Sequence, residues 1–432
     1  MPDHSNIPRG AATRRFFGVI VAGLFAVLAL GASVVAVDPY LHFDTPRIEG
    51  FNRWKTRFFY GQYDSKARLV RAMRPRHLVI GSSTAAGSLR PDHPLFNGEP
   101  AFNYALAGST PHLQGMALAH ALEGGTVRSV IIGVDLFSYN AFMDQRAFRQ
   151  FELAVEQGGG WRGHWRRWRR ELETSFAEAL GYEALTDALG TVREQGRPGA
   201  GGIYRDIRAD GYWQNPRPAG MAQLPLFTTI ERQYLSGGWF PEPERRYALD
   251  DGRGRSTPDE LGAMLERASA AGVDVTIAIM PFHARFAEAM HEAGLWNDFD
   301  ELKRRIVALA AEPRFARSGL RVWDFSGYHT LSMDAVKGAT RDTPWFEDSI
   351  HPTEATGDMM LLRMRGGAAA EGRVPADFGR LLDAAHLDAG LAAAVAQRAQ
   401  YQAQHPADVE QVRLIARQTA AWREGARGAP AD

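Results

Sequence analysis

Residues 77–87 read HLVIGSSTAAG, and this stretch decides the fold. Residues 77–80 are apolar and lie between Pro75 and Gly81, which is typical of a short buried strand. The small residues that follow allow a tight turn, which would expose the hydroxyl of Ser83 at the carboxyl end of that strand. A serine at this place often only caps the next helix, so the turn alone does not identify a nucleophile.

Further apolar runs predict buried strands at 129–134, 273–280 and 320–323, and helical patterns lie between them at 113–122, 258–270 and 299–311. Strands that alternate with helices favour an α/β fold with a parallel central sheet covered on both faces. Such sheets carry their ligands beyond the carboxyl ends of the strands. Ser83 would therefore lie at the functional edge.

The chain divides into four parts by composition. Residues 1–15 form a polar tail, 16–37 an apolar segment, 38–365 the α/β domain, and 366–432 an alanine-rich helical appendage ending in a polar tail. Residues 141–257 are rich in Gly, Trp, Arg and Pro and fit an insertion into the α/β domain.

Within this insertion, Trp161, Trp165 and Trp168 recur at helical spacing among arginines. Such a helix could lie on a membrane surface or stack on sugar rings, but we favour the alternative, a tryptophan stripe packed against the core with the arginines in water.

The segment 16–37 carries no charge and would span ~33 Å as a helix, enough to cross a bilayer. Arginines precede it at positions 9, 14 and 15, which predicts a cytoplasmic N-terminus and a periplasmic body, anchored once in the inner membrane. The alternative is a cleaved signal peptide, whose apolar core is usually shorter, and Arg14-Arg15 also fits a twin-arginine export signal. All three interpretations predict that residues 38–432 are exported from the cytoplasm.

Composition excludes several classes of function. Fifty basic residues balance fifty acidic ones, so the whole chain gives no electrostatic reason to expect nucleic acid as a partner. The absence of cysteine excludes thiolate nucleophiles and cysteine-ligated zinc. No His-Glu-x-x-His motif is present, and no glycine-rich phosphate loop with a lysine, so we expect neither a metal nor a cofactor.

A second motif lies far downstream, where Asp348 and His351 are separated by two residues just before a predicted helix. A turn of this length can bring the carboxylate to the imidazole, where it would fix the tautomer and stabilise the imidazolium. Alone, the motif is more often a surface turn with a capping aspartate. With the upstream strand-Gly-x-Ser turn, it predicts a Ser83-His351-Asp348 triad.

The two motifs together resemble those of the SGNH (GDSL-type) hydrolases. GSSTAAG (81–87) is similar to the Gly-x-Ser-x-x-x-Gly block of that superfamily, and DSIHPTEATG (348–357) is similar to its Asp-x-x-His block, in the same order. The anchor followed by Asp38-Pro39-Tyr40, together with NYALAGS (103–109), resembles the membrane-tethered branch that includes the D-alanylation and alginate O-acetylation proteins. The resemblance covers about residues 38–145 and 258–365, and implies a three-layer SGNH-like fold.

The resemblance implies roles for single residues. Ser83 matches the nucleophile, His351 the base, Asp348 the orienting acid, and Gly108 the glycine whose amide helps to form the oxyanion hole. Two positions depart from the pattern. Ser82 replaces the usual aspartate, and the asparagine that normally donates to the oxyanion is replaced by the sequence GVDLF at 133–137. One such donor stabilises the transition state by ~3 kcal/mol.

Two further residues follow predicted strands and so point to the same edge. Asp135 could face the cleft, or it could cap the next turn or pair with an arginine. His283 could contact substrate, or it could be a structural imidazole.

The resemblance implies a serine O-acyltransferase or esterase acting on acyl groups, acetyl above all, of a cell-envelope glycan or exopolysaccharide, with a membrane acyltransferase as a candidate partner. The alternative is a non-catalytic SGNH-like scaffold of a polysaccharide assembly complex. The acyl group, the acceptor, and the choice between hydrolysis and transfer stay open.

Overall fold

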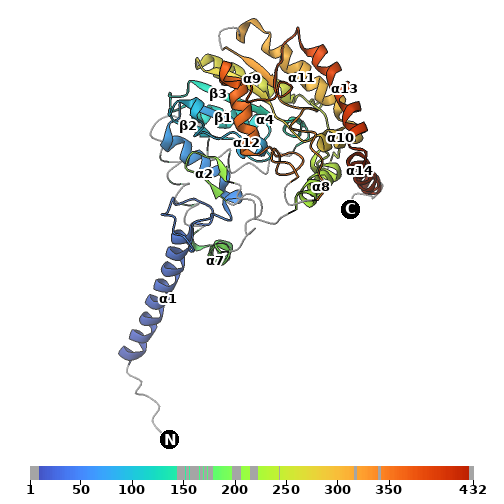
Figure 1. Cartoon of the computed structure of the whole chain (residues 1–432). Helices are drawn as coiled ribbons and strands as arrows, with labels where there is room; N and C mark the ends of the chain where they lie inside the picture. Colours follow the sequence, from blue (N-terminus) through green and yellow to red (C-terminus); the bar gives the residue numbers. More distant parts are fainter. Residues whose placement is uncertain are drawn as a thin grey trace. The chain divides into compact units, whose positions relative to one another are not determined.

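The computed structural model describes residues 9–143, 151, 155, 165, 169, 173, 179–196, 206–214, 222–242, 244–315, 319–338 and 342–427 (Figure 1). The chain forms two compact units. Unit 1 comprises Met1–Ser65 and Gln157–Asp206, and unit 2 comprises Lys66–Glu156 and Ile207–Asp432. The middle part of the expected insertion, residues 157–206, thus belongs to the same unit as the apolar segment, and the two ends of the insertion belong to unit 2.

The strands and helices have the following bounds. The strands are β1 (His77–Ile80), β2 (Ala101–Asn103), β3 (Ser129–Val134), β4 (Asp206–Ile207), β5 (Trp213–Gln214), β6 (Asp274–Ile279), β7 (Arg321–Asp324) and β8 (Arg380–Leu381). The helices are α1 (Arg9–Val37), α2 (Phe58–Met73), α3 (Ser83–Ala86), α4 (Pro111–Leu122), α7 (Tyr182–Glu194), α8 (Gln223–Gln233), α9 (Thr257–Ala270), α10 (Ala284–Glu292), α11 (Trp296–Ala310), α12 (Glu354–Arg365), α13 (Leu387–Gln404) and α14 (Pro406–Arg427). Short 3₁₀ turns are η1 (Pro94–Phe96), η2 (Phe137–Tyr139), η5 (Pro313–Phe315) and η6 (Gly367–Ala370), and η4 (Tyr234–Gly238) is a π turn.

The central sheet of unit 2 has the strand order β2-β1-β3-β6-β7-β8. The first five strands are parallel, and β8 pairs antiparallel with β7. The sequence therefore predicted the α/β class and the mostly parallel sheet correctly. After β1 the chain forms β2 on one side of that strand and then β3 on its other side. The strand order therefore reverses between β1 and β3, and open parallel sheets bind ligands at such a topological switch point.

Helices cover the sheet because their apolar stripes need a partner surface. On one side α4 packs against α9, and α9 packs against α11, which also contacts β7. Figure 1 shows α12 crossing in front of the sheet. The strand residues between these layers are almost fully buried, as Ile80, Ile132 and Ile277 illustrate. The sheet is thus a rigid base for the loops at its carboxyl edge.

The C-terminal region, expected to be an appendage, contributes to unit 2 directly. It supplies β8, and buried ion pairs attach its helices to α10. Arg398 of α13 binds both carboxylate oxygens of Glu288 at 3.0 Å, and Arg285 of α10 binds Glu231 at 2.8 Å and Asp408 of α14 at 3.1 Å. Removing one partner of such a buried pair is strongly destabilising, so these helices are fixed to the core.

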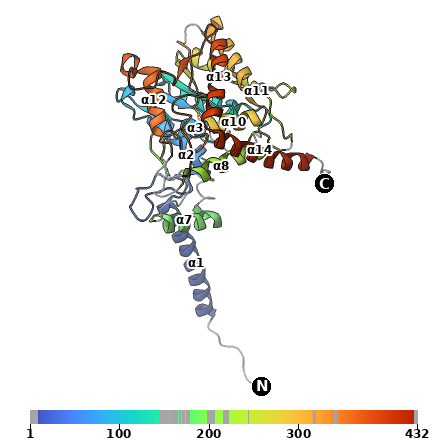
Figure 2. The same ribbon diagram turned by 45° about the vertical axis from the view of Figure 1, so that its right-hand side comes forward.

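In unit 1, α1 is long and apolar enough over Thr13–Val37 to cross a membrane, and it is the one such helix among the described residues. Its C-terminal end packs against α7, as Figures 1 and 2 both show. Of the three tryptophans expected to form a stripe, Trp161 and Trp168 lie outside the described residues. Trp165 is helical and 55% exposed.

Candidate active site

The turn after β1 presents two adjacent serines in different roles. Ser82 is the residue that caps α3, since its side chain accepts a hydrogen bond from the amide of Thr84. Ser83 is the first residue of the helix and is only half-buried. The capping role that could have explained Ser83 therefore belongs to its neighbour, and the Ser83 hydroxyl is left for another partner.

That partner is His351. The Ser83 hydroxyl lies 2.9 Å from Nε2 of His351, although the two residues are 268 positions apart in the sequence. On the other side of the ring, Nδ1 of His351 lies 2.7 Å from Oδ2 and 3.0 Å from Oδ1 of Asp348. A carboxylate at Nδ1 holds the proton there and leaves Nε2 to accept one from the serine. The three predicted residues thus form a continuous hydrogen-bonded chain.

The loop that carries His351 is held from several sides. Asp348 is fully buried, and its Oδ1 also accepts from the amides of Ile350 and His351 at 2.9 and 3.0 Å. The amide of Glu347 donates to the carbonyl of His351 at 2.8 Å, which closes the turn. Because two backbone amides hold Oδ1 in place, Asp348 can orient the imidazole without first adopting another rotamer.

Gly108 lies in the loop after β2, with a φ of +67° that favours glycine. The carbonyl of Gly81 accepts from the amide of Leu106 at 2.8 Å and from the hydroxyl of Ser109 at 3.1 Å, which attaches this loop to the turn that carries Ser83. Within the described part of the chain, the amides of Gly108 and Ser83 have no hydrogen-bond acceptor. Both can donate to an oxyanion.

A buried lysine supports the same loop from below. Nζ of Lys66, in α2, donates to the carbonyl of Ala105 at 2.7 Å and lies 5.7 Å from the ring centre of Trp213. Burial lowers the pKa of Lys66 well below its ordinary value of 10.5. Lys66 is buried and holds the backbone of this loop through the carbonyl of Ala105, so it supports the site structurally.

Asp135 lies next to the turn that carries Ser82 and Ser83 and is 7% exposed. Its carboxylate accepts a short hydrogen bond from the Ser82 hydroxyl, a second from the Thr84 hydroxyl at 3.4 Å, and a third from the amide of Ser138 at 3.0 Å. Of the roles considered from the sequence, capping the next turn is thus present. The link to Ser82 adds a role that the sequence did not suggest, since it connects the end of β3 to the residue beside Ser83.

His283 is fully buried and serves as a helix cap, not as a group presented at the surface of the site. Its Nδ1 accepts from the amide of Arg285 at 3.2 Å, and its Nε2 lies 2.9 Å from the carbonyl of Asp334. Burial, with a smaller effect of the nearby Arg285, lowers the pKa of His283 from 6.5 to about 3. Its amide donates to the carbonyl of Ser349 at 2.9 Å, so the residue supports the loop that carries His351. His283 is therefore a structural imidazole, which was the alternative considered from the sequence.

Some residues that build the site were not foreseen. Gly357 of α12 approaches the backbone of Ser88 so closely that a Cβ atom would lie 1.9 Å from its carbonyl oxygen. Near this contact, Arg90 binds both oxygens of Asp358 at 2.7 and 3.0 Å. The segment that carries His351 and the segment that carries Ser83 are thereby held together.

Two buried amide side chains complete the framework. Nδ2 of Asn103, at the end of β2, donates to the carbonyls of Ala85 and Leu89 at 2.9 and 2.8 Å, which fixes α3. Nε2 of Gln223 donates to the carbonyl of Phe346 at 2.8 Å, which fixes the start of the Asp348 turn. Asn103 stands in the NYALAGS stretch that carried part of the resemblance. No sequence signal distinguished Gln223.

Among the residues that the structure describes, no cluster of three or more His, Asp or Glu side chains could hold a metal ion. No protein-family model matches the chain, and the comparison with curated proteins also finds no match.

Proposed function

We propose that the protein is a membrane-anchored serine acyltransferase or esterase that acts on acyl groups, acetyl above all, of a cell-envelope glycan or exopolysaccharide. The observation that carries the proposal is the pair of hydrogen bonds from Ser83 to His351 and from His351 to Asp348, at 2.9 and 2.7 Å. The acyl chemistry and the glycan come from the resemblance to the SGNH superfamily.

In the first half-reaction, Oγ of Ser83 attacks the carbonyl carbon of the acyl donor while Nε2 of His351 takes the hydroxyl proton. Asp348 stabilises the imidazolium that forms. The carbonyl oxygen becomes an oxyanion that accepts from the amides of Ser83 and Gly108. When the tetrahedral intermediate collapses, the donor alcohol leaves with the proton held by His351, and the acyl group stays on Ser83 as an ester.

In the second half-reaction, a hydroxyl group of the acceptor gives its proton to Nε2 of His351 and attacks the acyl-Ser83 carbonyl. The Ser83–acyl bond breaks, and His351 returns the proton to the serine oxygen. Water in place of the acceptor gives hydrolysis. Since Asp135 replaces the usual asparagine donor and is bonded to Ser82 and Ser138, two amides alone stabilise the oxyanion in this scheme. We therefore expect slow turnover of simple esters and faster turnover with a glycan acceptor.

The membrane-length helix α1 and the arginines at its N-terminal end support a location of the site on the periplasmic side of the inner membrane. A glycan assembled or exported there would meet the site directly. A membrane acyltransferase that delivers the acyl group is the corresponding candidate partner.

Acyl-enzyme trapping tests the proposal. The full chain in detergent is mixed with p-nitrophenyl acetate, quenched and digested, and acetylated peptides are located by mass spectrometry. We expect acetyl on Ser83, its loss in Ser83→Ala, and its retention in the matched variant Ser82→Ala. Equal acetylation of wild type and Ser83→Ala would overturn the proposal.

A further inference from the structure

The last two turns of α1 belong to the core of unit 1. Val34 and Val37 are 1% and 5% exposed and pack against Ala184 and Ala188 of α7. This contact begins at Gly31, where a Cβ atom would come within 2.9 Å of the Leu180 side chain. Loss of α1 by cleavage would remove half of this small core.

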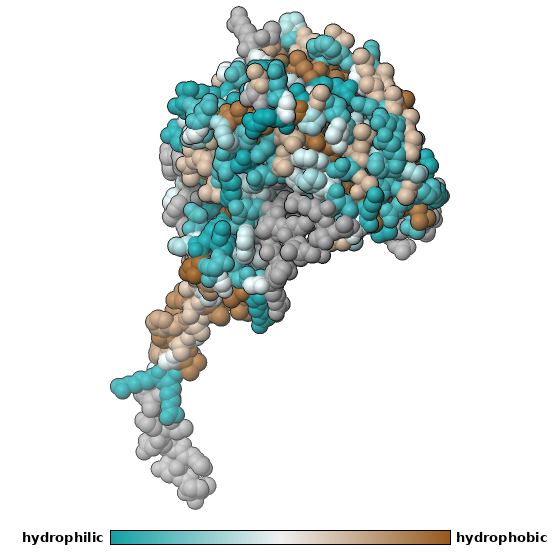
Figure 3. Space-filling model, in the orientation of Figure 1, coloured by the Kyte–Doolittle hydropathy of each residue, from teal (hydrophilic) through white to brown (hydrophobic). Residues whose placement is uncertain are grey.

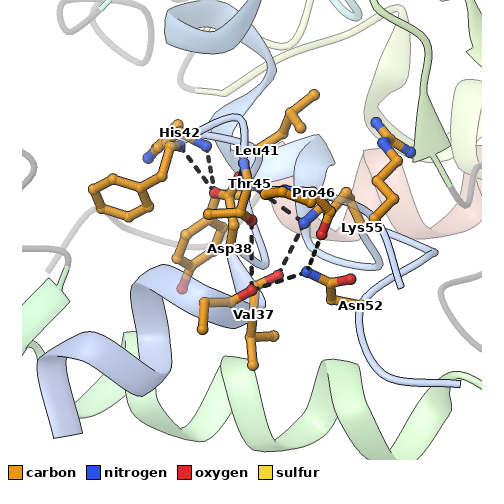
Figure 4. Close-up of polar contacts among 12 residues, drawn as sticks. Val37, Asp38, Leu41, His42, Thr45, Pro46, Asn52 and Lys55 are labelled. Carbon is orange, nitrogen blue, oxygen red and sulfur yellow. Dashed lines mark hydrogen bonds and ion pairs between the residues drawn. The ribbon is translucent and has the colours of Figure 1, made fainter. Parts of the chain in front are cut away.

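The end of α1 is also capped by the chain that follows it (Figure 4). Nζ of Lys55 donates to the carbonyl of Val37 at 2.9 Å, and Nδ2 of Asn52 donates to the carbonyl of Ala36 at 2.9 Å. Asp38 lies 3.9 Å from Lys55 and accepts from three backbone amides of the next loop. The three polar side chains are buried, so the orientation of α1 within unit 1 is fixed.

The length of α1 that remains for lipid is short. Residues 13–30 are exposed, and burial against unit 1 starts at Gly31. This exposed part is ~27 Å long as a helix, about the thickness of the hydrocarbon core of a bilayer. If it spans the hydrocarbon, the bilayer surface lies close to Gly31, which is also where α7 meets α1.

The outer face of α7 suits that position. Tyr182, Thr186, Leu189 and Arg193 lie along one side of the helix, opposite the buried alanines, and all four are exposed. Tyr182 is 81% exposed and Leu189 50%, and Leu180 just before the helix is 48% exposed. Figure 3 shows hydrophobic side chains along α1 and more of them beside its upper end, where Figure 1 places α7.

We propose that α7 lies in the headgroup interface of the bilayer that α1 crosses, with Leu180, Tyr182 and Leu189 in contact with lipid. Leu180 meets α1 at Gly31, where the exposed part of α1 ends, tyrosine is favoured at membrane interfaces, and Arg193 on the exposed face can reach lipid phosphates. Unit 1 then contacts the membrane surface and holds α1 at a fixed angle to it. This inference does not depend on the serine chemistry.

Because the chain contains no cysteine, single labels can test the proposal in the full protein. The variants Leu189→Cys, Tyr182→Cys, Leu24→Cys and Asp388→Cys are labelled with the fluorophore NBD and placed in phosphatidylcholine–phosphatidylglycerol vesicles. Leu24 is an exposed residue of α1 and reports on the hydrocarbon, and Asp388 of unit 2 is exposed and reports on water. Nitroxide lipids quench from shallow or deep positions.

We expect labels at 182 and 189 to lose most of their fluorescence to shallow nitroxides, the label at 24 to deep ones, and the label at 388 to neither. If the label at 24 is quenched while those at 182 and 189 behave like the label at 388, α7 lies in water and the proposal fails. Labels at 182 and 189 with blue-shifted emission but no quenching by lipid would show that protein covers this face, which also overturns it.

Discussion

The contact between Gly357 and Ser88 predicts that one added methyl group disrupts the site from a distance. In Gly357→Ala, the new Cβ atom would lie 1.9 Å from a backbone carbonyl oxygen, whereas ordinary contacts start near 3.4 Å. Neither partner is the end of a flexible side chain. The strain therefore has to move α12 away from the segment that follows α3.

The displacement needed is about 1.5 Å, the difference between those two distances. Helix α12 starts at Glu354, three residues after His351, so most of this shift reaches the imidazole. The Ser83–His351 hydrogen bond of 2.9 Å would then be lost. A misplacement of ~1 Å costs about 100-fold in rate, and overpacking costs ~1–3 kcal/mol, partly offset by the ~1 kcal/mol helix preference of alanine over glycine.

The assay is the rate at which a fluorophosphonate labels Ser83, measured beside thermal unfolding. We expect labelling to fall by about 100-fold with a modest loss of stability. The matched control is Gly115→Ala in α4, where a Cβ atom meets nothing within 4 Å. This variant should keep the wild-type labelling rate and gain ~0.5–1 kcal/mol in the free energy of unfolding. Wild-type labelling and stability in Gly357→Ala would refute the reasoning.

Three more predictions concern single side chains. His351→Ala should lose nearly as much labelling as Ser83→Ala, ~10⁴-fold or more, because base and nucleophile act as a unit, whereas Asp348→Asn should lose less; equal labelling rates in all three would contradict this. Ser82→Ala should keep most of the labelling but lose ~1–3 kcal/mol in the free energy of unfolding measured with urea, since the buried Asp135 carboxylate loses one hydrogen-bond donor. His283 has its pKa lowered from 6.5 to about 3, so the unfolded chain binds the extra proton and stability falls as the pH drops from 6.5 towards 3. His283→Asn, which can keep the cap but cannot take up that proton, should flatten the fall measured by urea titration at several pH values.

The long apolar strands and the two chemical motifs could be predicted from sequence because each is local. The strand bounds of β1 and β3 agree with the apolar runs at 77–80 and 129–134. In contrast, β2 and β8 have three and two residues and exist through their pairing with β1 and β7, so periodicity could not reveal them.

The contacts that hold the triad segments in place could not be predicted from the sequence, for a related reason. Gly357 matters because of where Ser88 lies, and Asn103 because three carbonyls of the α3 segment surround its amide group. Both are contacts between segments that are distant in sequence, which neither composition nor spacing encodes. The same applies to unit 1, where α7 meets the end of α1 through small residues such as Ala184 that carry no sequence signal.

The most direct test of the central claim is the position of a covalent fluorophosphonate adduct on the full chain. The reagent forms a bond only with a serine whose hydroxyl is activated by a base. The account predicts one adduct, on Ser83, that disappears in His351→Ala while that variant stays folded. No adduct on the wild type, or an adduct on another serine that survives Ser83→Ala, would contradict the account.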